Sequence, residues 1–206
     1  MSIESGFATL LLLVFLFLSI TVHEFSHGWV ADKLGDSTAR QAGRLSLNPL
    51  RHIDVFGTLI LPVVLLLASH GSFSFGYAKP VPVNPYHFRN PRRGMMWVAL
   101  AGPAVNVLMG IFFALLLKAG WPFFTQALLT VMIINFALGF FNMVPIPPLD
   151  GSKIVAAFLP PRASYKYLKM EIAGIIAIII LLQAGIFNWF LESFLTIALK
   201  FLDVRI

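Results

Sequence analysis

Long apolar segments constrain this chain more than any other feature, and the first of them, ATLLLLVFLFLSITV, occupies residues 8–22. A helix needs roughly 20 apolar residues to cross a bilayer. Because no water in that core can satisfy backbone N–H and C=O groups, such segments cross as helices. We therefore predict an all-α membrane protein with about five spans, the last two forming a closing pair, at residues 6–31, 94–117, 121–144, 170–184 and 186–202.

The composition supports a membrane protein of one domain over residues 1–206. The chain is 58% hydrophobic and only 12% charged, whereas about a quarter of the residues in a soluble domain are charged. Its net charge of +6 does not indicate nucleic acid binding, because basic residues beside apolar segments are typical of cytoplasmic loops. The chain has no cysteine, which excludes disulfides and thiolate ligands. The N-terminal MSIESG lacks Lys and Arg, so we expect the first segment to be retained.

The path of VFGTLILPVVLLLAS, residues 55–69, decides the topology. As a helix it would reach only about 22 Å, and Pro62 interrupts it. If it does not cross, 14 of the 15 basic residues share one side, in residues 32–54, 79–93, 150–169 and 200–206. If it crosses, 10 basic residues lie on one side of the membrane and 5 on the other. The positive-inside rule favours the first arrangement. We predict a re-entrant or shallow segment, an N-terminus outside a bacterial plasma membrane, and a site toward the cytoplasm.

The first span ends in HEFSH, residues 23–27, which places polar residues where they are costly. On a helix, His23 and His27 lie on one face, so both imidazoles can reach one tetrahedral zinc ion. Glu24 is rotated by about 100°, from where its carboxylate can act as a general base. H-E-x-x-H on a helix is typical of zinc hydrolases. The alternative is a wet helix end with solvated side chains.

A catalytic zinc needs a third protein ligand, and Asp150 is the acidic residue with the best context. Three prolines, at 145, 147 and 148, end the preceding helix and favour extended backbone, with Asp150-Gly151 forming a turn. The alternative role for Asp150 is to cap a helix that begins near Ser152. The predicted topology favours the ligand, because the first and third spans then run in the same direction. Asp32 and Asp36 lie in a charged loop, where we expect them to be solvated.

Three motifs together resemble the site-2 protease family of intramembrane zinc metalloproteases: HEFSH, AGPAVN at 101–106 and NMVPIPPLDG at 142–151. The resemblance covers about residues 6–155, the catalytic core, and leaves a closing helix pair at about 165–202. NPLRHIDVFGTLILP at 48–62 and GYAKPVPVN at 76–84 are similar to the short bacterial branch. The chain shows neither a PDZ-like insertion nor a C-terminal nucleotide-binding pair of domains.

The resemblance implies one Zn²⁺ per chain, bound by His23, His27 and Asp150, with Glu24 as the general base. It also implies that Asn142 and Asn106 face the substrate. Residues 72–84 would form a β-hairpin-like loop whose edge pairs with a substrate strand. The implied substrates are single-span membrane proteins, cleaved within the lipid bilayer in regulated intramembrane proteolysis.

Two alternatives stay open. His52 and Asp54 would orient a zinc-bound imidazole, or Asp54 would cap the next segment, which we favour. A divalent-metal transporter is the second function class, because polar residues inside a membrane also mark ion pathways. Transporters usually contain internal repeats, and this sequence shows none.

Overall fold

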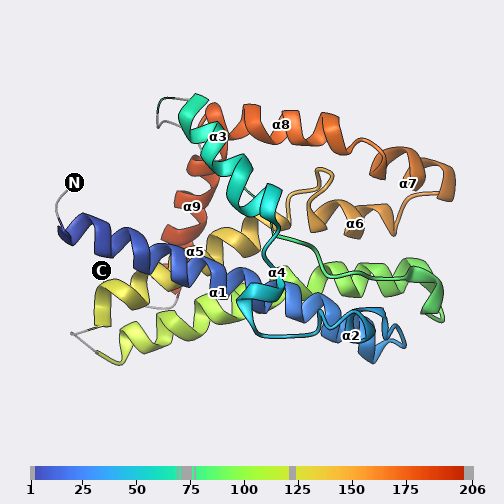
Figure 1. Cartoon of the computed structure of the whole chain (residues 1–206), viewed down its shortest axis with the longest axis horizontal. Helices are drawn as coiled ribbons and strands as arrows, with labels where there is room; N and C mark the ends of the chain where they lie inside the picture. The colour runs from blue at the N-terminus through green and yellow to red at the C-terminus, as the bar shows by residue number, and fades with distance from the viewer. Residues whose placement is uncertain (1–2, 69, 71–75, 77, 121–123, 202–206) are drawn as a thin grey trace.

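The computed structural model describes residues 3–68, 70, 76, 78–120 and 124–201. All regular structure in these residues is helical (Figure 1), which confirms the predicted all-α class. The α-helices are α1 (Ile3–Lys33), α2 (Thr38–Gln41), α3 (Leu61–Ala68), α4 (Pro91–Lys118), α5 (Thr125–Asn142), α6 (Asp150–Ala156), α7 (Pro161–Leu168), α8 (Glu171–Gln183) and α9 (Ile186–Phe201). Short 3₁₀ turns, η1 (Pro49–Arg51) and η3 (Pro85–His87), and a π-helical turn, η2 (Val55–Ile60), complete the order.

Three helices, α1, α4 and α5, form the centre of the molecule, and each packs against the other two. Within the described residues, these are the helices that are long and apolar enough to cross a membrane. Helices α8 and α9 have 13 and 16 residues, fewer than the roughly 20 that a span needs. The number of five spans therefore stays a prediction.

Residues next to helix α4 set both of its ends. The side chain of Asn90 accepts a hydrogen bond from the backbone N–H of Arg93, and Pro91 occupies the first turn. Gly120, with a φ of +79°, follows the helix in the left-handed conformation.

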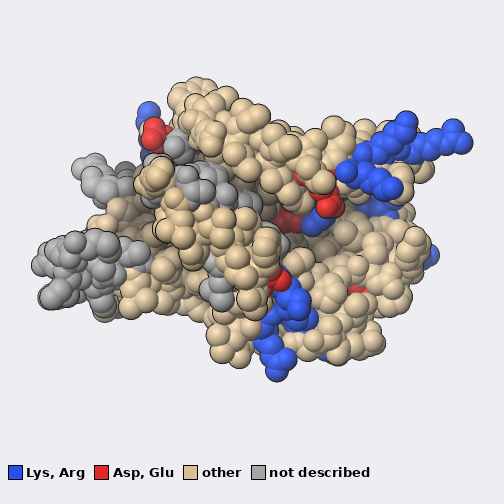
Figure 2. Space-filling model, turned by 45° about the horizontal axis from the view of Figure 1, so that its top comes forward, with Lys and Arg blue, Asp and Glu red and all other residues tan. Residues whose placement is uncertain are grey.

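Figure 2 shows that Lys and Arg gather mainly at the right-hand end and lower middle of the visible face, with uncharged residues covering most of the rest. This mostly uncharged surface agrees with the membrane location that the three long apolar helices support.

Of the segment at residues 55–69, residues 55–68 form one short helix, in which the π-helical turn η2 continues directly into α3. The Asp54 side chain accepts a hydrogen bond from the backbone N–H of Gly57 at 2.7 Å. This contact confirms that Asp54 caps the segment. Of the predicted β-hairpin-like loop at 72–84, residues 72–75 and 77 lie outside the described residues. The described remainder contains no strand, so the hairpin is not confirmed.

Helix α9 runs antiparallel to α5. Near its start, Phe187 contacts the rings of Phe140 and Phe141, and Phe194 contacts Phe136 one turn earlier in α5. Near its end, Leu199 packs on the cluster that contains Ala114 of α4. Lys200 therefore lies toward the Lys118 end of the bundle, whereas the charge pattern predicts that the 200–206 tail joins the basic loops. These ring contacts between α5 and α9 accompany the antiparallel direction of α9.

Candidate metal centre

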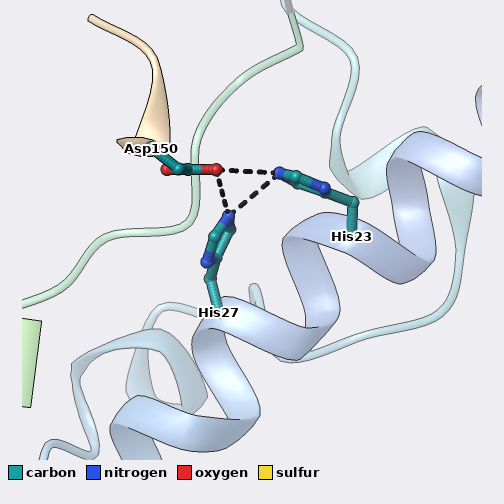
Figure 3. A group of neighbouring side chains, drawn as sticks. All are labelled: His23, His27 and Asp150. Carbon is teal, nitrogen blue, oxygen red and sulfur yellow. Dashed lines mark hydrogen bonds and ion pairs between the residues drawn. The ribbon is translucent and has the colours of Figure 1, made fainter. Parts of the chain in front are cut away.

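His23, His27 and Asp150 form one buried cluster, although Asp150 is 127 residues from His23 in sequence. Asp150 Oδ2 lies 3.1 Å from His23 Nε2 and 3.0 Å from His27 Nε2, and the two Nε2 atoms are 3.0 Å apart. Figure 3 shows these three atoms pointing toward a common centre. The three residues are between 5% and 8% exposed, so the cluster is shielded from solvent.

Asp150 reaches the histidines because the chain folds back after α5. Residues 143–149 are not helical, as the prolines predict. Asp150 and Gly151 are not a loop turn, however, but the first residues of α6, whose cap is Leu149 in an extended conformation. A Cβ on Gly151 would lie 2.2 Å from the Met143 carbonyl oxygen, so the return path needs glycine there. Figure 1 shows α1 and α5 running toward the site in the same direction, as the sequence predicts.

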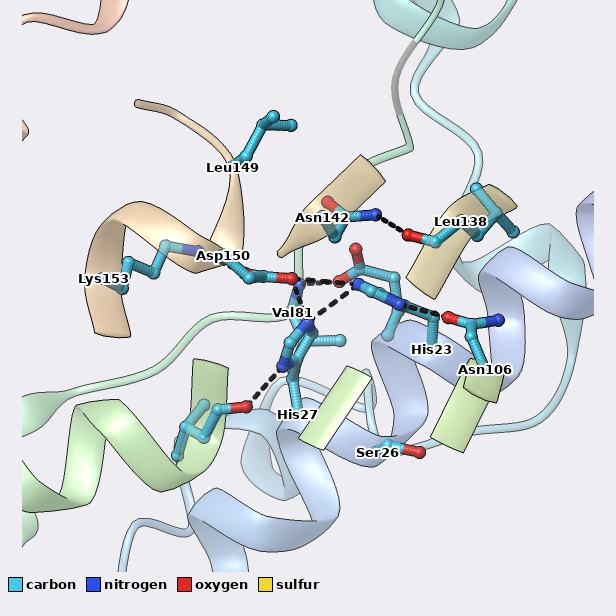
Figure 4. Close-up of polar contacts among 12 residues, drawn as sticks. His23, Ser26, His27, Val81, Asn106, Leu138, Asn142, Leu149, Asp150 and Lys153 are labelled. Atoms are coloured by element: carbon cyan, nitrogen blue, oxygen red, sulfur yellow. Dashed lines mark hydrogen bonds and ion pairs between the residues drawn. The ribbon is translucent and has the colours of Figure 1, made fainter. Parts of the chain in front are cut away.

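The other nitrogen of each imidazole is held by an oxygen from α4. His23 Nδ1–H donates to Asn106 Oδ1 at 2.5 Å, and His27 Nδ1–H donates to the Val98 carbonyl at 2.6 Å. A carbonyl-type oxygen can only accept, so the neutral imidazoles present unprotonated Nε2 atoms to the centre. Asn106 is held in turn, since its Nδ2 donates to Asn135 at 2.8 Å. Figure 4 shows Asn106 beside His23.

Helix α4 also approaches the imidazoles directly at Gly102. A Cβ at this position would lie 2.5 Å from His27 Nε2 and 2.6 Å from His23 Nε2. No role for Gly102 is predicted from the sequence. The AGPAVN motif contains the relevant signal, because small residues on a membrane helix indicate that a neighbouring helix packs closely against it.

The cluster fits a zinc ion. With Nδ1 protonated on both histidines, two Nε2 lone pairs and a carboxylate oxygen face one another, and three acceptors repel unless a cation lies between them. Tetrahedral zinc separates nitrogen and oxygen ligands by about 3.3–3.5 Å, within a few tenths of an ångström of the separations in this site. Lys153 Nζ donates to Asp150 Oδ1 at 3.0 Å, which leaves Oδ2 for the ion.

Glu24 lies beside this cluster on the wall of a cavity of about 210 Å³. His27, Val81, Asp150 and Lys153 also line the cavity, which has room for several water molecules at about 30 Å³ each. The Val81 backbone N–H donates to Glu24 Oε2 at 2.9 Å. A larger cavity of about 400 Å³ has apolar walls from α5, residues 143–149, α8 and α9, and none of the predicted site residues lines it.

Two other predicted site residues, Asn142 and His52, contact backbone carbonyls outside the metal cluster. The Asn142 side chain donates to the Leu138 carbonyl of its own helix at 3.0 Å, so its substrate role stays a prediction, as does that of Asn106. His52 is buried, and its Nε2 is 2.8 Å from the Ser46 carbonyl oxygen. His52 therefore contacts Ser46, and Asp54 contacts Gly57. Neither residue contacts the metal ligands in the part of the chain that the structure describes.

Comparisons with known proteins agree with this geometry. The pattern of peptidase family M50 matches residues 11–123 and 117–184. A Bacillus subtilis (strain 168) protein named "Putative zinc metalloprotease YwhC" is 35% identical, over 82% of this chain and 78% of the relative. "Putative zinc metalloprotease Rip2" of Mycolicibacterium smegmatis is 28% identical, over 85% and 68% respectively. "Zinc metalloprotease MJ0392" of Methanocaldococcus jannaschii is 28% identical, over 77% and 36%. No solved structure matches the chain.

Proposed function

This chain belongs to peptidase family M50, the site-2 protease family, and on that basis we propose that it is a zinc protease that cleaves membrane-spanning substrates. The observation that carries the proposal is the convergence of His23, His27 and Asp150 beside Glu24. A bound zinc ion would act as a Lewis acid on the peptide carbonyl and on water.

Glu24 takes the proton in the proposed reaction. One carboxylate oxygen removes a proton from the attacking water while the water oxygen bonds to the carbonyl carbon of the substrate. The C–N bond then breaks, and Glu24 returns the proton to the leaving nitrogen. Val81 N–H holds the other oxygen, Oε2, so one oxygen stays available for the proton.

The proposed substrates are single-span membrane proteins, because the cluster is buried among apolar helices. Their helices must unwind before cleavage, since helical peptide groups are hydrogen-bonded within the helix. Asn142 and the edge at residues 79–84 are the proposed contacts for the unwound backbone. We also propose that the site opens toward the cytoplasm. The comparisons do not favour a divalent-metal transporter, because the named relatives are zinc metalloproteases.

Glu24→Gln separates metal binding from catalysis, because it keeps the size of the side chain and removes the base. The assay is cleavage of a reporter peptide, a single span of about 20 apolar residues with a fluorophore and a quencher at its ends, in liposomes. We expect zinc affinity to persist and the cleavage rate to fall by about 10²–10⁴-fold. Asp150→Ala should lower zinc affinity and activity together. Normal cleavage by Glu24→Gln would refute the proposal.

A further inference from the structure

Asp36 is a buried carboxylate outside the metal centre. The sequence predicts that it is solvated, but the structure leaves none of its surface exposed. Its Oδ1 accepts hydrogen bonds from the backbone N–H and hydroxyl of Thr38, at 3.1 and 2.5 Å, and lies 2.8 Å from His87 Nδ1. Its Oδ2 accepts from the Asn84 backbone N–H at 2.6 Å. Burial of a charge is costly, and these contacts make it tolerable, so the site is built for a carboxylate.

The contact with Asn84 ties down one end of the segment at residues 79–84. The other end is held by Arg44 and His52, which precede η2 in the chain. Arg44 Nη2 donates to the Lys79 carbonyl at 2.5 Å, and the Lys79 N–H donates to the His52 carbonyl at 2.9 Å. The described part of this segment has no regular hydrogen-bonded partner strand. Its position therefore depends on these anchors and on the packing of Val81 and Val83.

Val81 lies between the two anchored ends and is the point at which the segment meets the metal centre. Its N–H donates to Glu24 Oε2 at 2.9 Å, and its side chain is only 7% exposed. A Cβ on Gly28 would lie 3.0 Å from a Val81 methyl group, so the segment packs closely on α1. A small shift of Asn84 would therefore move the donor that holds the Glu24 carboxylate.

We infer that Asp36 is a positioning residue for Glu24, acting through the 79–84 segment. The inference rests on the proposed function, in which Glu24 is the general base. Hydrogen bonds to a charged acceptor are short and directional, so the Val81 N–H fixes one carboxylate oxygen and directs the other toward the attacking water. Asp36 holds the segment in the register that makes this bond. The Asp36→Asn change would replace one of the two acceptor oxygens with an NH₂ donor, so the side chain could no longer accept hydrogen bonds from both Thr38 and Asn84.

The first test compares Asp36→Asn with Asp32→Asn. Asp32 lies in the last turn of α1 and pairs with Arg40, so its substitution is a matched control that leaves the 79–84 segment alone. With the reporter peptide, we expect Asp36→Asn to lower kcat by about 10- to 100-fold, the range that a misplacement of about 1 Å produces. The zinc dissociation constant should stay close to that of the wild type, and Asp32→Asn should have the kcat of the wild type. An unchanged kcat for Asp36→Asn would overturn the inference.

A second pair of variants tests the Asp36 contact if Asp36→Asn does not fold. Asn84→Pro removes the backbone N–H that Asp36 accepts, whereas Asn84→Ala keeps it and loses only the side chain. We expect kcat to be lower for Asn84→Pro than for Asn84→Ala, and the two variants to bind zinc with equal affinity. Equal kcat values, or a loss of zinc affinity that accounts for the loss of rate, would overturn it.

The last test asks whether Asp36 acts through Val81. Val81→Pro removes the donor to Glu24, and Val81→Ala is its control, because the N–H remains. If both residues serve one contact, combining Asp36→Asn with Val81→Pro lowers kcat no further than the more damaging single change. If the double variant lowered kcat by the product of the two single effects, the inference would be overturned. These outcomes are distinct from a failure of the proposed function, which would show first as normal cleavage by Glu24→Gln.

Discussion

Gly102→Ala is the most direct test of the metal centre, because one methyl group would enter the space between the two imidazoles. The added Cβ would lie 2.5 Å from His27 Nε2 and 2.6 Å from His23 Nε2. An ordinary van der Waals contact is 3.4 Å or longer, so the rings or α4 must move by about 0.9 Å. Zinc–ligand distances tolerate about 0.2 Å. We expect the variant to bind zinc about 100-fold more weakly, at the upper end of the loss that changes around the ligands produce.

This loss of affinity corresponds to about 2.7 kcal/mol and is measurable as lost stabilisation. At a zinc concentration about 1,000 times the wild-type dissociation constant, zinc stabilises the folded wild type by about 4.1 kcal/mol. The same concentration is only about 10 times the dissociation constant of the variant, so the gain falls to about 1.4 kcal/mol. Thermal melting in detergent, with and without zinc, measures this difference, and titration against a competing chelator measures the affinity itself.

Gly110→Ala is the matched control on the same helix. Its Cβ would lie 2.7 Å from ring carbons of Phe136, in an apolar cluster away from the ligands. This variant should lose stability but keep its affinity for zinc. Wild-type zinc affinity in Gly102→Ala, or an equal loss in both variants, would refute the argument that α4 touches the ligands through Gly102.

Asn106→Ala should weaken zinc binding by about 10- to 100-fold, because His23 loses the acceptor that orients it; a change in KM for the reporter peptide without a change in zinc affinity would instead favour the substrate role. Cysteines at positions 40 and 90 should react with an impermeant reagent from the same side of a liposome, in a chain with no native cysteine; labelling from opposite sides would make residues 55–69 a full span. The pKa of Asp36 is held below its ordinary value of 3.8, because burial, which raises it, is outweighed by hydrogen bonds from Thr38, Asn84 and His87. Its contribution to stability is therefore complete above pH 3.8 and is lost as the pH falls through the lowered pKa, so melting temperatures should fall more steeply with acid in the wild type than in Asp36→Asn.

The sequence by itself determined the features that depend on neighbouring residues. Apolar length predicts the helices that match α1, α4 and α5, because a backbone in lipid has few other ways to satisfy its polar groups. The spacing of His23 and His27 places both imidazoles on one face, because 3.6 residues complete a helical turn. Asp54 caps its helix by a contact with Gly57, only three residues away.

Tertiary structure alone decided how distant segments meet. The sequence names Asp150 as a candidate ligand, but only the fold brings its carboxylate to His23 across 127 residues. It also places Gly102 against the imidazoles, and it buries Asp36, which local charge indicates is solvated. These contacts depend on how helices pack and on where loops return, and a residue's immediate neighbours specify neither. The periodicity of one segment describes the face that it presents, whereas the partner of that face is set by the packing of the whole chain.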